Sequence, residues 1–136
     1  MKPLHLLLPA VALTAACASG ARQPYAPVGH VSYQAMGAEP FWVLTIGDDL
    51  IVLDTGLGQD GAEGGGPATW PRTLPRTVDG VKTWESGDGT SVIGIEARPG
   101  PCTTEGAEIY EDHVRVRLSG RELNGCGGRL IGREED

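Results

Sequence analysis

A carboxylate, a proline and two adjacent aromatic side chains stand together in the stretch GAEPFW, residues 37–42. The side chain of Glu39 could accept hydrogen bonds from a ligand, while the rings of Phe41 and Trp42 could pack against one. Glu39, Phe41 and Trp42 are therefore a candidate binding pocket.

The same stretch also has a structural interpretation, which the sequence favours. A small β-domain needs a large side chain to fill its core, and Trp42, Leu44 and Ile46 would share one face of a strand. Pro40 suits the first residue of that strand, where no ladder N–H is required. Glu39 could then accept hydrogen bonds from the backbone or from an arginine at the mouth of a barrel.

Two of the three cysteines, Cys102 and Cys126, are candidates for a disulfide. An even pair in an exported chain favours a bridge, and a loop of about 25 residues would contribute roughly 3 kcal/mol in the chain-entropy model. A metal or redox pair is disfavoured because there is no CxxC spacing and no nearby histidine at ligand spacing. We expect neither a metal nor a cofactor.

The third cysteine, Cys17, closes a segment with the organisation of a secretory signal, MKPLHLLLPAVALTAAC. Its apolar run of about a dozen residues contains Pro9 and is too short to span a bilayer. TAAC is similar to a bacterial lipobox, which implies that residues 1–16 are removed and that Cys17 is lipidated. Several acyl chains on that cysteine would anchor the protein stably.

The segment after Cys17 is polar and contains proline, so residues 17–29 are predicted to be a lipidated tether and residues 30–133 a β-domain. Residue 18 is alanine rather than the aspartate that commonly retains lipoproteins in the inner membrane. We therefore expect the protein in the outer membrane, lipid-anchored and facing the periplasm.

The sequence IVLDTG offers a different chemistry at Asp54. Asp-Thr-Gly after an apolar strand resembles the way an aspartic protease presents its catalytic carboxylate, and retroviral-type enzymes pair two of these across a homodimer. Against this, Asp54 precedes a glycine-rich segment, and no flap hairpin is recognisable. We keep a protease as an alternative and expect no catalytic residue.

The charge of the chain limits its partners. The formal net charge is −7, and removing Lys2 with the signal makes it −8. Such an acidic chain without a cluster of basic residues argues against nucleic acid, and the only expected contact with the membrane is the N-terminal lipid. The partner is expected to be an envelope protein or a small ligand.

The pattern of residues predicts an all-β fold. Short β-forming segments are separated by turns, and a hairpin is expected over residues 41–54. In HVRVRLSG, Val114, Val116 and Leu118 should lie on one face, with His113, Arg115 and Arg117 on the other. Residues 56–76 are rich in glycine and proline and are expected to form a long loop. The prediction is a small antiparallel barrel or sandwich of about seven strands.

Three stretches together, GAEPFWVLTI, RPGPC and YEDHVRVRLSGRELNGCGG, resemble a family of small bacterial envelope lipoproteins of uncharacterised function. The resemblance covers about residues 34–128. After Cys102 the sequence departs from the pattern of the family, because TTEGAEIY lacks the usual Asp and Met-Ser. It implies a lipid-anchored module for binding or envelope maintenance, without catalysis. More loosely, the chain resembles membrane-bound inhibitors of animal-type lysozyme, so a lysozyme inhibitor is an alternative. The Ser-Gly-x-x-Tyr stretch of those inhibitors is absent, because Leu123 replaces the tyrosine.

Overall fold

The structure is a computed structural model that describes residues 30–55 and 67–135. In this part of the chain there is no helix, and so no helix that is long and apolar enough to cross a membrane. Within these described residues, nine antiparallel strands form one sheet in the order β4-β3-β2-β1-β9-β8-β7-β6-β5. Their bounds are β1 Tyr33–Ala38, β2 Phe41–Ile46, β3 Leu50–Asp54, β4 Ala68–Pro71, β5 Arg76–Val78, β6 Val81–Gly87, β7 Val92–Thr103, β8 Glu108–Leu118 and β9 Arg121–Arg133. The predicted all-β class is confirmed.

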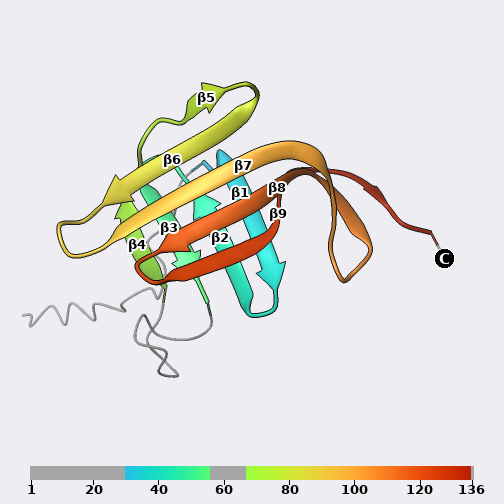
Figure 1. Cartoon of the computed structure of the whole chain (residues 1–136), viewed down its shortest axis with the longest axis horizontal. Coiled ribbons are helices and arrows are strands. Elements are labelled where there is room, and N and C mark those ends of the chain that lie inside the picture. Colours follow the sequence, from blue (N-terminus) through green and yellow to red (C-terminus); the bar gives the residue numbers. More distant parts are fainter. Residues whose placement is uncertain (1–29, 56–66, 136) are drawn as a thin grey trace, which may run out of the picture.

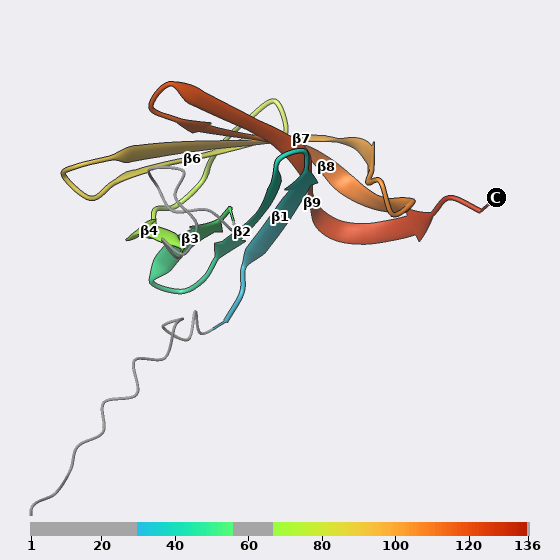
Figure 2. The same ribbon diagram turned by 90° about the horizontal axis from the view of Figure 1, so that it is seen from below.

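The sheet curls into a half-barrel, so that β1 to β4 form one layer and β6 and β7 lie in the other (Figures 1 and 2). Two side-chain hydrogen bonds join the layers where β4 approaches β6. The indole N–H of Trp70 donates to the hydroxyl of Ser91 at 3.0 Å, and the hydroxyl of Ser86 donates to the carbonyl of Pro71. These bonds hold the edge strand β4 against β6 and the turn between β6 and β7.

The core fills the space between the layers. Period-2 alternation along β2, β3, β4 and the first part of β7 places alternate apolar side chains on the inner face, as expected for a half-buried sheet. Tyr33 stacks at a tilt on Trp84, with ring centroids 5.0 Å apart. The largest fully buried side chains are Trp42, Leu44, Ile46, Ile51, Ile93, Ile95, Val116 and Leu123.

The expectation of a long loop over residues 56–76 was wrong for its second half. Residues 68–71 form β4, which pairs with β3 and places Trp70 opposite Ile51, both of them buried. A proline-containing strand is tolerated here because β4 is at the edge of the sheet. With β5, this strand explains why the described part of the chain has nine strands rather than about seven.

The turn of GAEPFW also differs from the expectation. Ala38 pairs with Phe41, so Glu39 and Pro40 are the two loop residues of the β1–β2 hairpin, and the peptide bond between them is cis. A cis proline at the third position of a four-residue turn defines a type VI turn. Pro40 therefore belongs to the turn, and the strand begins one residue later.

The clean alternation predicted near residue 113 is confirmed. Val114 and Val116 are buried, Leu118 packs partly against the core, and the side chains between them are exposed. The strand is longer than that stretch, since β8 begins at Glu108, and its partner β9 runs without interruption from Arg121 to Arg133.

Candidate functional site

The candidate pocket residues of GAEPFW do not converge on one point. Trp42 is 0% exposed and lies in the core, whereas Phe41, on the opposite face of β2, is 61% exposed, and Glu39 is exposed in the turn. Adjacent residues of a strand point to opposite faces of the sheet, so Phe41 and Trp42 cannot face the same ligand. Trp42 has the structural position that the sequence favoured.

The side chain of Trp42 packs where β1 and β2 meet β9. Its indole N–H donates to the carbonyl of Asn124 at 3.3 Å. A Cβ atom at Gly37 would lie 2.1 Å from Nε1 of this indole, and one at Gly125 would lie 2.0 Å from the carbonyl oxygen of Met36. Both positions must be glycine for the strands to approach this closely. The GAEPFW and NGCGG stretches thus form one packing unit, which we call the seam.

A buried polar pair lies beside the seam. The hydroxyl of Tyr33 donates to Oδ2 of Asp112 at 2.8 Å, and both residues are buried. Burial, followed by the hydrogen bond to the carboxylate, raises the pKa of Tyr33 well above its ordinary value. A Cβ atom at Gly127 would lie 2.9 Å from that hydroxyl, so a glycine is needed here too. The pair satisfies two polar groups that would otherwise be buried without partners.

Cys102 and Cys126 form the predicted disulfide, with a Sγ–Sγ distance of 2.02 Å. The bond joins β7 to β9 across the intervening strand β8. Their Cα atoms are 5.5 Å apart, although two inter-strand spacings in a flat sheet amount to roughly 9.5 Å. The sheet therefore folds sharply about β8, where register shifts occur on both of its sides.

The other candidate residues are dispersed. Asp54 is the last residue of β3, opposite Val43 and half-buried. The Nε2 atom of His113 lies 2.9 Å from the carbonyl oxygen of Pro101, on the exposed face. Cys17, the lipidation candidate, lies outside the described residues. Within the described ranges no group of three or more His, Cys, Asp or Glu residues could hold a metal ion.

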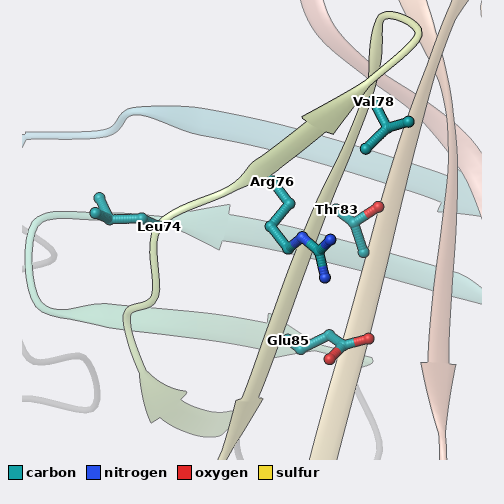
Figure 3. Close-up of a pocket in the computed structure, with 5 residues that line it drawn as sticks. All are labelled: Leu74, Arg76, Val78, Thr83 and Glu85. Atoms are coloured by element: carbon teal, nitrogen blue, oxygen red, sulfur yellow. The ribbon is translucent and has the colours of Figure 1, made fainter.

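A surface depression of about 260 Å³ lies on the outer face of β5 and β6. Figure 3 shows the side chain of Arg76 extending from β5 toward β6, the strand that carries Thr83 and Glu85. Leu74 and Val78, both exposed, supply apolar surface at its border. The depression thus offers a cation, a carboxylate and apolar contact within one short stretch of sheet.

Glu85 also lines a second depression, of about 540 Å³, at the neighbouring ends of β6, β7 and β8. Glu85 pairs with Gly94, which in turn pairs with Arg117, so the three form one row across the sheet. The nearest atoms to a Cβ at Gly94 would be Nε and Cβ of Arg117, at 3.9 and 4.0 Å. The missing side chain therefore leaves a gap between a carboxylate and a guanidinium. We call the two depressions together the outer groove.

One wall of the outer groove is the turn between β6 and β7. The carboxylate of Asp88 accepts from the backbone N–H groups of Ser91 and Thr90 and from the hydroxyl of Thr90, each at 2.8 Å. These donors stabilise the carboxylate and lower the pKa of Asp88 to about 2. The turn is thereby fixed in place beside Thr90 and Ser91, which line the groove.

Two arginines of the outer groove differ from their neighbours. On the same face, Arg98 forms an ion pair with Glu96 at 3.2 Å, and Arg115 forms one with Glu122 at 3.3 Å. Over residues 30–55 and 67–135, by contrast, no ion pair holds Arg76 or Arg117. Both guanidinium groups are exposed and can bind an anionic group from solution.

Sequence reasoning identified only part of this groove. The alternation in HVRVRLSG placed Arg117 on the outer face, but Arg76 lay in the segment expected to be a loop, and Glu85 had no distinguishing motif. Comparisons of the chain with protein-family models, with curated proteins and with solved structures found no match.

Proposed function

We propose that this protein is a lipid-anchored, periplasm-facing binding module of the bacterial envelope, without catalysis, and that its outer groove binds a small ligand with an anionic group. It would belong with the small envelope lipoproteins that its sequence resembles. The lipid on Cys17 would hold the module at the outer membrane, and the tether would let the β-domain reach ligands in the periplasm.

The observation that carries the proposal is the position of Arg76 and Arg117 on either side of Glu85 in one groove, where no ion pair within residues 30–55 and 67–135 holds either of them. Two other arginines of the same face, Arg98 and Arg115, do form ion pairs with carboxylates. Arg76 and Arg117 keep five donors each, arranged for bidentate contact with a carboxylate or a phosphate.

The remaining surface of the groove fits recognition better than it fits reaction chemistry. Glu85 can accept from an amine or hydroxyl of the same ligand, and the hydroxyl groups of Thr90 and Ser119 add further polar contacts. Exposed Leu74, Val78 and Val92 provide apolar contact along the border. A ligand with one anionic end and a hydroxyl- or amine-bearing body would satisfy all of these groups.

The test uses the full chain, with and without Arg76→Ala and Arg117→Ala, as bait for small molecules from an envelope extract. Bound molecules are released by denaturation and compared by mass spectrometry. We expect an anionic species that is enriched on the wild type and lost from the double variant, with binding weakened by salt. The matched control is Arg98→Ala, which removes a paired arginine of the same face and should leave binding intact. Equal retention by wild type and double variant would contradict the proposal.

A further inference from the structure

Strand β7 contains a glycine, Gly94, at a position where a side chain would fit. Other glycines of the sheet have a steric or conformational reason, because a side chain at Gly125 would collide with the backbone of β1, and Gly128 has a positive φ of 81°. Gly94 has neither feature. An added Cβ atom would have Nε and Cβ of Arg117 as its nearest neighbours, at 3.9 and 4.0 Å, which is ordinary contact.

A glycine inside a strand weakens the strand, and it often marks a place where a ligand approaches the backbone closely. Gly94 lines the larger depression of the outer groove and pairs in the ladder with Glu85 on one side and Arg117 on the other. The body of a ligand can therefore lie against the backbone of β7 between these two charged side chains. This observation is independent of the ion pairs that the arginines lack.

The charges along the outer groove alternate in sign. Arg76 pairs with Thr83, so it lies diagonally from Glu85, which is two residues further along β6. Figure 3 shows Arg76 extending toward that strand. Arg117 follows on the other side of the gap at Gly94. The backbones of the two arginines are separated by three inter-strand spacings, roughly 14 Å, which two arginine side chains and a short ligand can span together.

The carboxylate between the two arginines is available to a ligand as well. Among the residues that the structure describes, no ion pair uses Glu85. Glu122 lies opposite Arg117 on β9, but its carboxylate is bound to Arg115 at 3.3 Å. An anion held by either groove arginine lies near Glu85, and the two negative charges repel each other unless the same ligand also carries a positive charge.

We propose that the outer groove binds a zwitterion in which an ammonium group lies between two anionic groups, the pattern of an acidic amino acid. This assignment rests on the proposed function and narrows it to one class of ligand. The ammonium donates to Glu85, the two anionic groups accept from Arg76 and Arg117, and the body of the ligand crosses β7 at Gly94. A dianion of the same length without the ammonium leaves Glu85 unpaired and binds more weakly.

Isothermal titration calorimetry of the full chain tests the class of ligand with three probes, glutamate, 2-hydroxyglutarate and glutarate. They share one carbon skeleton and carry an ammonium, a hydroxyl or a hydrogen on the second carbon. We expect glutamate to bind about tenfold more tightly than either of the others, because its ammonium forms a charge-assisted hydrogen bond with Glu85. Glu85→Gln should bring the three affinities together. The matched control Glu96→Gln should not, since Glu96 is already paired with Arg98.

A second variant, Gly94→Val, tests where the ligand lies. We expect it to weaken glutamate binding about tenfold, because the valine fills the space that the ligand needs. The melting temperature should stay the same or rise, since the added Cβ atom has room and valine favours strands. A variant that loses stability together with binding would show that the fold needs this glycine, and would overturn its place in the site.

Equal binding of glutarate and glutamate would overturn the zwitterion and leave the anion-binding groove of the proposed function standing. Lack of binding of all three probes up to about 10 mM would overturn the zwitterion too. The proposed function fails by a different result, which is capture of the same molecules from an envelope extract with and without Arg76 and Arg117.

Discussion

Replacing Trp42 with alanine should destabilise the domain severely, because this side chain is the centre of the seam. Removing a buried aromatic side chain from a core costs about 3–5 kcal/mol. Trp42 is 0% exposed and packs against Gly37 and Gly125, which have no side chains that could move into the space. The carbonyl of Asn124 would also lose its donor, which costs about 1 kcal/mol more. The expected loss therefore lies at the upper end of the range, a large share of the 5–15 kcal/mol typical of a domain.

The assay is urea unfolding followed by far-UV circular dichroism, with the disulfide kept oxidised. The matched control is Phe41→Ala, because this neighbouring aromatic is 61% exposed and should cost no more than about 0.5 kcal/mol. Trp42→Phe should fall between the two, since it keeps a ring but removes the N–H. A cost below about 1 kcal/mol for Trp42→Ala, or an equal cost for Phe41→Ala, would refute the packing argument.

Three further outcomes are expected. Replacing Cys102 and Cys126 together with serine should cost about 3 kcal/mol, from the loop closed by a separation of 24 residues, measured by the same unfolding assay. Folding raises the pKa of Tyr33, so the stability that its neutral hydroxyl contributes should be fully present below about pH 10 and should be lost as the pH rises further. Tyr33→Phe should remove this loss of stability at alkaline pH, as measured by melting curves. Cys17→Ser should abolish labelling with palmitate and membrane fractionation, and unchanged labelling would exclude lipidation at this residue.

Much of the fold was predictable because it follows from local alternation. The hairpin over residues 41–54 was visible as two runs of β-forming residues around a turn, and β2 and β3 lie where those runs are. The outward face of β8 followed from strict period-2 spacing. The disulfide followed from the count of cysteines, although its path across β8 depends on bulges that no local pattern revealed.

The parts that were missed depend on contacts between distant residues. Strand β4 lies in a segment whose composition predicts a loop, and it is ordered by pairing with β3 and by burial of Trp70. The candidate pocket at Glu39, Phe41 and Trp42 failed to converge for a geometric reason, since neighbouring strand residues face opposite sides. The outer groove combines residues of β5 to β8, and only the order of strands in the sheet brings them together.

The residues that build the scaffold differ from the residues that are proposed to bind the ligand. In the stretches GAEPFW and NGCGG, Gly37, Trp42 and Gly125 meet in the seam, where bulk and the absence of a Cβ atom decide whether the strands can pack. Arg76 and Glu85 lie outside those stretches, on an outer face where substitution would leave the core intact. Proteins that share the seam can therefore differ in their ligands, because a common scaffold does not fix the chemistry of a surface groove. The proposed ligand should be sought through Arg76, Glu85 and Arg117 rather than through the packing residues of the seam.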